Sequence, residues 1–309
     1  VADFGEDIIG RLDVREAGLK AISAKDIGAI FGLTEAQARG ALAAGQVTVS
    51  NQGAPVPALA DGAYGYLRFH GEALDSLYSL DNPYLLETGS GQAMSPLDAT
   101  AGASAPTALV TAVTEIERDV FAGLVVADDP EADYWYELGF VGGDATYGQA
   151  SISLPAPDAQ AFESLTLRFK GAGETEHRID VQLAGGEILG TATWSGFEDF
   201  ELEVDLTSVP VSGEILTLEL IASGGGGDFS YYDGATLTYA RAPAVEDGAL
   251  AFTARGQTTA ITDFTSPRIR VLDLSDPAAP KALSGVEITP AATGYQARFA
   301  TVAGNRYLA

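Results

Sequence analysis

The sequence predicts a mainly β, multi-domain protein with a small mixed α/β N-terminal region, a central jelly-roll-like β-sandwich and a small C-terminal β domain. Its 309 residues are more than one ordinary hydrophobic core accommodates. Hydrophobic residues make up 46% of the chain, which is enough to bury substantial cores. The 36 glycines, together with Asp and Pro, separate short segments of alternating apolar residues, a pattern typical of strands joined by turns.

Residues 1–107 form the predicted mixed α/β region, because they carry both helix and strand signals. Ser23 begins a short helix that Gly32 ends. Thr34 and Gln37 form a capping-box pattern that begins a second helix. Strands are expected on either side of these helices, at 13–19, 47–49 and 64–69.

Residues 108–243 form the predicted sandwich. The preceding segment, 88–107, is rich in Gly, Ala and Ser, and we expect it to be a linker. Apolar residues then alternate with polar ones over several short segments, and Gly185 with Gly186 marks a hairpin turn between two of them. Short strands at regular spacing, each with one apolar face, favour two packed sheets. The expected strands lie at 110–119, 165–169, 179–183, 188–194, 200–206, 216–220 and 237–239.

Residues 244–309 form the predicted small β domain. The turn at 275–277 separates two of its apolar segments. The expected strands lie at 250–253, 269–274 and 295–302.

The charge balance excludes several classes of partner. The chain has 17 Lys and Arg against 43 Asp and Glu, a net charge of −26. Such a chain is repelled by nucleic acids and by anionic lipid surfaces, so neither is expected as a partner. No apolar segment approaches the roughly 20 residues that a membrane-spanning helix needs. The chain begins with Val1 and carries no signal peptide, so we expect a processed product or a piece of a longer protein.

The sequence contains no complete catalytic set. Cysteine is absent, which excludes disulfides, thiolate metal sites and a cysteine nucleophile. The two histidines, His70 and His177, lie far apart, and no serine occupies a G-x-S-x-G elbow beside either. Carboxylates are too numerous for a glycosidase pair to be selected from sequence alone. We therefore expect that this chain alone is not an enzyme.

The densest carboxylate cluster consists of Asp128, Asp129, Glu131 and Asp133. Closely spaced oxygen ligands in a loop are typical of calcium sites, so calcium is the one cofactor considered. The glycine and the spacing of an EF-hand are absent, and a solvated acidic turn is the alternative.

Three aromatic residues are candidates for ligand stacking: Tyr134, Trp135 and Trp194. Flat aromatic rings that stack on apolar sugar faces would form a carbohydrate-binding platform. Aromatic side chains in strands also pack into cores and sheet edges, and this is the alternative.

The order of several motifs resembles the region that precedes the catalytic domain in gingipain-type cysteine peptidases. The resemblance covers roughly residues 10–309, and two positions depart from the family pattern, where Ala184 replaces Asn and Gly234 replaces Trp. The matching segments are YGYLRFHG at 64–71, LYSLDNPYLL at 77–86, DYWY at 133–136, the hairpin at 176–190 followed by WSG at 194–196, the strand at 232–241, and VLDLSDP at 271–277.

This resemblance implies the non-catalytic pro- or accessory region of a secreted gingipain-like peptidase, located outside the cell or on its surface. The family's catalytic domain would follow Ala309, and it is the partner that the resemblance implies. The implied roles are assistance in folding, latency, or a scaffold for the peptidase. Two alternatives stay open: an extracellular binding module that depends on carbohydrate or calcium, and a structural subunit of a surface layer or filament.

Overall fold

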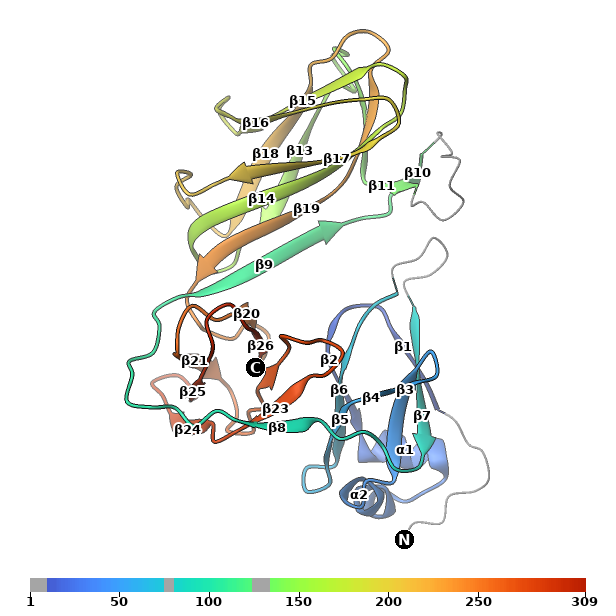
Figure 1. Ribbon diagram of the computed structural model, residues 1–309, viewed down its shortest axis with the longest axis vertical. Helices are drawn as coiled ribbons and strands as arrows, with labels where there is room; N and C mark the ends of the chain where they lie inside the picture. The colour runs from blue at the N-terminus through green and yellow to red at the C-terminus, as the bar shows by residue number, and fades with distance from the viewer. Residues whose placement is uncertain (1–9, 75–80, 124–133) are drawn as a thin grey trace. The chain divides into compact units, whose positions relative to one another are not determined.

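The computed structural model describes residues 10–74, 81–123 and 134–309. The described residues form several β-sheets and two helices, which confirms the mainly β fold class. Close contacts divide the chain into two compact units (Figure 1). Unit 1 comprises residues 1–107 together with 244–309, and unit 2 comprises residues 108–243. The division into three independently folding regions stays a prediction.

Unit 1 begins with a small α/β arrangement of two sheets and two helices. One sheet has the strand order β1-β7-β3-β4 and the other the order β2-β6-β5. The elements are β1 (Gly10–Val14), β2 (Gly18–Ser23), α1 (Ala24–Phe31), α2 (Glu35–Ala43), β3 (Val47–Asn51), β4 (Ala54–Val56), β5 (Ala58–Asp61), β6 (Tyr66–Gly71), β7 (Asn82–Thr88) and β8 (Ser95–Asp98).

The capping signals of both helices act as the sequence predicts. The Ser23 side chain accepts a hydrogen bond from the backbone of Asp26 at the start of α1, and Gly32 ends this helix in the left-handed conformation, with φ of 67°. At the start of α2, Thr34 and Gln37 form both bonds of the capping box. The apolar faces of the helices join buried strand residues in one core.

The remainder of unit 1 consists of short strands. One sheet has the order β21-β25-β24, and another path runs β20-β26-β22-β23-β8. In the latter, β8 lies parallel to β23, with Ser95 opposite Lys281. Residues 88–107, the expected linker, therefore contain the strand β8. This strand forms by pairing with β23, which is distant in sequence. The elements are β20 (Ala251–Thr253), β21 (Thr258–Phe264), β22 (Leu272–Asp273), β23 (Lys281–Ser284), β24 (Glu287–Pro290), β25 (Tyr295–Ala300) and β26 (Arg306–Leu308).

Unit 2 is a two-sheet β-sandwich. One sheet has the order β17-β14-β19-β9, with β12 also paired to β19, and the other has the order β13-β18-β15-β16 (Figure 1). A small pair, β10-β11, completes the unit. The elements are β9 (Val110–Glu117), β10 (Phe121–Ala122), β11 (Trp135–Tyr136), β12 (Leu138–Val141), β13 (Gln149–Pro155), β14 (Ala159–Gly171), β15 (Glu176–Leu183), β16 (Ile188–Ser195), β17 (Asp199–Asp205), β18 (Ile215–Ala222) and β19 (Phe229–Arg241).

Alternation along the strands builds the sandwich core. Leu165 and Leu167 of β14 and Leu218 and Leu220 of β18 are fully buried in one apolar cluster that draws on both sheets. Because β9 and β19 pair antiparallel, Val110 lies opposite Arg241, so the unit begins and ends at neighbouring positions.

Candidate functional site

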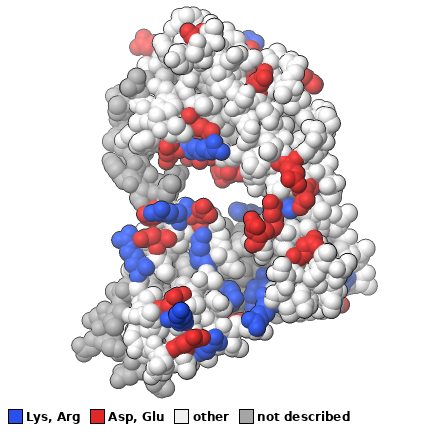
Figure 2. Space-filling view, turned by 180° about the vertical axis from the view of Figure 1, so that it is seen from behind, with Lys and Arg blue, Asp and Glu red and all other residues white. Residues whose placement is uncertain are grey.

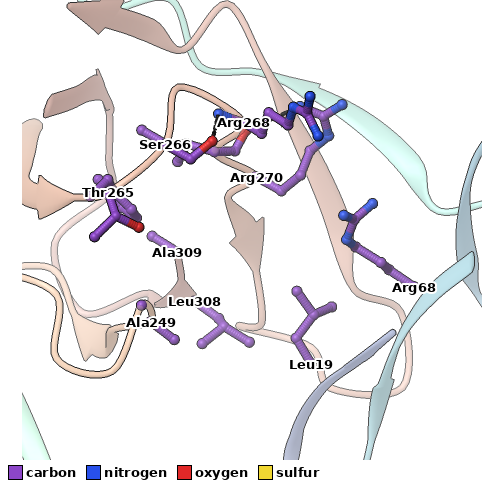
Figure 3. A pocket seen from close by; sticks show the side chains of 12 residues that line it. Leu19, Arg68, Ala249, Thr265, Ser266, Arg268, Arg270, Leu308 and Ala309 are labelled. Atoms are coloured by element: carbon purple, nitrogen blue, oxygen red, sulfur yellow. Dashed lines mark hydrogen bonds between the residues drawn. The ribbon is translucent and has the colours of Figure 1, made fainter. Parts of the chain in front are cut away.

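A pocket in unit 1 gathers three of the chain's 17 basic side chains: Arg68, Arg268 and Arg270. Arg68 lies on β6, and the other two lie in the segment that joins β21 to β22. The cavity has a volume of about 200 Å³. In Figure 3 the side chains of Arg268 and Arg270 extend along one side of the pocket, and Arg68 approaches from the neighbouring strand.

One carboxylate serves two of these arginines. Arg270 Nη2 donates a hydrogen bond of 2.7 Å to Asp61 Oδ2. The same oxygen lies 3.9 Å from Arg68 Nη1, which is an ion-pair distance but too long for a hydrogen bond. Arg68 Nη1 is buried and has no hydrogen-bond partner among the described residues. The Arg68 guanidinium thus keeps an unused donor inside the protein.

The Tyr64 ring supports the other two guanidinium groups. Arg268 lies 5.0 Å and Arg270 lies 5.5 Å from the centre of this ring, distances typical of cation–π contacts. Within the part of the chain that the structure describes, no carboxylate lies within ion-pair distance of Arg268. The positive charge of Arg268 is therefore stabilised by the Tyr64 ring and by solvent.

Electrostatic effects at the pocket reflect this excess of positive charge. Burial alone would raise the pKa of Asp61, but hydrogen bonds from the Tyr64 backbone and from Arg270, with the charges of Arg270 and Arg68, outweigh it and lower the pKa. Burial lowers the pKa of Arg68, Asp61 opposes this shift, and Arg270 adds to it. The face drawn in Figure 2 carries basic side chains in small patches beside acidic ones, with large areas that carry no charge.

Apolar and hydroxyl side chains complete the pocket. Thr265 and Ser266 are exposed at its rim, and the Ser266 hydroxyl accepts a hydrogen bond from the backbone of Arg268. The apolar wall is formed by Leu19, Ala249, Phe264, Ile269 and Leu308. The pocket thus offers cationic donors next to a hydrocarbon surface.

His177, one of the two histidines considered for catalysis, is built into the sandwich core. Its Nδ1 lies 2.6 Å from Asp228 Oδ1, and its Nε2 lies 2.7 Å from the carbonyl oxygen of Gly196. Both ring nitrogens therefore face oxygen atoms, Nδ1 that of a carboxylate and Nε2 that of a carbonyl group. The two side chains are only 0% and 1% exposed. This pair stabilises the fold and is closed to a substrate.

His70 lies near the end of β6, where the sequence places a strand end. Its Nδ1 is 4.0 Å from Glu72 Oε1, and burial lowers the pKa of the imidazole. His70 belongs to unit 1 and His177 to unit 2.

The three candidate stacking aromatics occupy different environments. Trp194 is 7% exposed and stacks between Phe169 and Phe200, with ring centres 5.7 and 5.4 Å away. Its faces are therefore covered by the core and are not open to a sugar. Tyr134 and Trp135 are partly exposed, so a role for them in ligand stacking stays a prediction.

The candidate calcium ligands Asp128, Asp129, Glu131 and Asp133 lie outside the described residues, so the calcium prediction stays open. Among residues 10–74, 81–123 and 134–309, no group of three or more His, Asp or Glu side chains is placed to hold a metal ion. None of the helices in the same ranges has the length and apolar character needed to cross a membrane.

Sequence reasoning missed the arginine pocket. The available signal was the Arg-x-Arg spacing of Arg268 and Arg270 in a chain with few basic residues. Nothing in that spacing identifies Arg68 or Asp61 as neighbours, because about 200 residues separate the two segments and only the fold brings them together.

Comparison with known proteins gives a shared fold. No family model matches the chain, and no curated protein matches it. Among solved structures, it is similar to dimeric latent PorU from Porphyromonas gingivalis, with a TM-score of 0.70 and 11% identity. This likeness covers 97% of the present chain and 31% of PorU. The chain therefore spans about a third of the length of that protein.

Two carbohydrate-binding modules give smaller, partial likenesses. A CBM36 module in complex with calcium and xylotriose has a TM-score of 0.27 and 12% identity, over 40% of this chain and 98% of the module. A family 35 module from an environmental isolate has a TM-score of 0.28 and 17% identity, over 45% of this chain and 98% of the module. TM-scores this low support no conclusion about function. The fold that nearly the whole chain shares is that of a region of PorU.

Proposed function

We propose that the chain is a non-catalytic, extracellular accessory region of a gingipain-like peptidase, which holds the peptidase latent or provides a scaffold for it. The observation that carries the proposal is the length of the shared fold, which includes 97% of this chain but only 31% of PorU. The PorU structure is that of a latent form. The order of the gingipain-like motifs from residue 10 to residue 309 supports the same assignment.

A scaffold or latency role requires a stable contact with the catalytic domain. Such a contact buries on the order of 1,200–2,000 Å² in total. Because the chain carries a net charge of −26, part of the attraction would be electrostatic, and association should slow as salt is added. The accessory region itself would contribute no cysteine nucleophile to hydrolysis.

The direct test is co-expression of this chain and the domain encoded after Ala309 as two separate polypeptides. Co-purification of the two, with a peptidase less active in the complex than alone, supports latency. Co-purification without inhibition supports the scaffold role. A stop codon after Ala309, an unrelated following domain, or an active peptidase that never retains this chain refutes the proposal.

A second candidate, a carbohydrate-binding module, is favoured by one observation in unit 2. Tyr134 and Trp135 are partly exposed, and the next residue, Tyr136, stacks on Tyr231 with ring centres 4.5 Å apart at 12°. Partly exposed aromatic rings can stack against sugars. A glycan array tests this role, with a Trp135→Ala variant as control. Signals that the variant loses support the module, and an array without signals refutes it.

A further inference from the structure

We propose that the pocket lined by Arg68, Arg268 and Arg270 binds the carboxylate of a small apolar acid, such as the free carboxyl end of a peptide whose last residue is apolar. Nothing else described above assigns a ligand to this pocket. The inference rests on residues of unit 1, which include Ala309 at the end of the given sequence, and it is tested on the chain of 309 residues alone.

The charges around the pocket favour an anionic ligand. Three guanidinium groups line one small cavity, and a single carboxylate, that of Asp61, lies within pairing distance of them. Arg68 and Arg270 share this one carboxylate, and Arg268 has no ionic partner among the described residues. In a chain of net charge −26 most surfaces repel anions. An anion should therefore bind where positive charge is in local excess, as it is at this pocket.

A hydrogen-bond donor of Arg68 also lacks an acceptor. Arg68 Nη1 is buried without a partner, although its guanidinium lies only 3.9 Å from Asp61. A buried donor without an acceptor costs free energy, and turning the Arg68 guanidinium toward an oxyanion in the pocket would remove that cost. Guanidinium groups present planar pairs of donors that match the two oxygens of a carboxylate.

The apolar wall of the pocket indicates that the ligand also carries an apolar group beside its carboxylate. The pocket has a hydrocarbon wall that includes Leu19, Phe264 and Ile269, and the last two are 6% exposed. An inorganic anion gains nothing from such a wall, whereas an aliphatic acid gains from both surfaces. The volume of about 200 Å³ is below the range typical of drug-sized ligands, so it suits a single side chain with its carboxylate.

A peptide end fits these features better than a sugar acid. The terminal residue of a peptide carries its carboxylate and an apolar side chain on the same carbon, as the pocket requires. The rim hydroxyls of Thr265 and Ser266 are exposed and can accept a backbone N–H of the preceding residue. A uronic acid would place hydroxyl groups against the apolar wall and leave them without partners.

The test is calorimetric titration of the 309-residue chain at low salt. The probes are isocaproate, its neutral amide, inorganic phosphate, and a short peptide ending in leucine with either a free or an amidated carboxyl end. We expect isocaproate and the free-ended peptide to bind, and each amide to bind about tenfold more weakly or not at all.

Two variants connect the binding to the pocket. Arg268→Gln removes an exposed charge that makes no ion pair with a described residue, and it should weaken both acids about tenfold. Arg11→Gln is the matched control, since Arg11 is exposed on β1 and pairs with Asp13. It should bind like the parent chain, and both variants should melt at the parent temperature.

Several results overturn the assignment. Equal binding of acid and amide shows that the carboxylate is not recognised, and unchanged binding by Arg268→Gln places the ligand elsewhere. Phosphate that binds as tightly as isocaproate refutes the role of the apolar wall. Binding of isocaproate without the peptide assigns the pocket to free acids and refutes the peptide ligand. Absence of all binding refutes the proposal entirely.

Discussion

The buried pair of His177 and Asp228 gives the sharpest prediction for stability. Replacing Asp228 by Ala removes the acceptor of the 2.6 Å hydrogen bond from His177 Nδ1 and of a weaker one, 3.4 Å, from the Arg178 backbone. The ring remains in the core with a donor that faces a void. We expect the sandwich to lose a large part of its stability.

The magnitude follows from burial. Both side chains are about fully buried, so water cannot replace the lost partner. Breaking a buried ion pair by removing one member costs about 3–5 kcal/mol. A domain has only about 5–15 kcal/mol of stability in total. At a typical urea dependence for a domain of this size, the unfolding midpoint should fall by about 2 M.

Tryptophan fluorescence during urea unfolding is the assay, because both tryptophans of the chain, Trp135 and Trp194, lie in unit 2. Trp194 also contacts the His177 ring, with centres 5.0 Å apart. The signal therefore reports on this unit alone.

The matched control is Asp199→Ala, which removes an aspartate that is 83% exposed and pairs with Lys170 on the surface. Surface pairs contribute about 0–1 kcal/mol, so the midpoint should barely move. If Asp228→Ala and Asp199→Ala have the same midpoint, the buried pair does not stabilise the sandwich and the reasoning fails.

Three further predictions concern other residues. A Cβ on Gly224 would lie 1.9 Å from Asp228 Oδ2, whereas one on Gly226 would meet nothing within 4 Å. In urea unfolding, Gly224→Ala should therefore lower the free energy of unfolding by about 1–3 kcal/mol and Gly226→Ala by less than about 0.5 kcal/mol. Equal effects of the two substitutions would contradict this. Because the pKa of Asp61 is lowered by folding, its contribution to stability is complete above its unfolded pKa of about 3.9 and is lost as the pH falls through the lower folded value. Unfolding followed by circular dichroism should show this decline, and Asp61→Asn should flatten it; an equal slope in both proteins would refute the assignment. If residues 128–133 bind calcium, melting temperature should rise in millimolar calcium relative to chelator, and an unchanged curve favours a solvated turn.

Local signals were the most reliable guide from sequence to structure. The capping box of Thr34 and Gln37 needs only residues three apart, so the start of α2 could be predicted. The alternation in β14 likewise needs only neighbours, and Leu165 and Leu167 lie in the core as expected. Such patterns encode which face of an element is buried.

Contacts between distant segments could not be predicted. His177 and Asp228 are 51 positions apart, and the residues around His177 do not indicate which side chain becomes its partner. Trp194 was a candidate for sugar stacking because periodicity cannot distinguish an exposed ring from one packed between Phe169 and Phe200. These outcomes depend on which strands pair with one another, and strand pairing cannot be predicted from a single sequence.

The neighbouring positions of Val110 and Arg241 have a thermodynamic consequence for the rest of the chain. Unit 1 is made from two segments, and the whole of unit 2 connects them. While the sandwich is folded, its two ends lie close together, so unit 2 connects the two segments of unit 1 as a short loop would. Once it unfolds, unit 1 must close a disordered loop of roughly 130 residues, at an added entropic cost of about 3 kcal/mol. Damage confined to the sandwich is thereby transmitted to unit 1 through chain entropy.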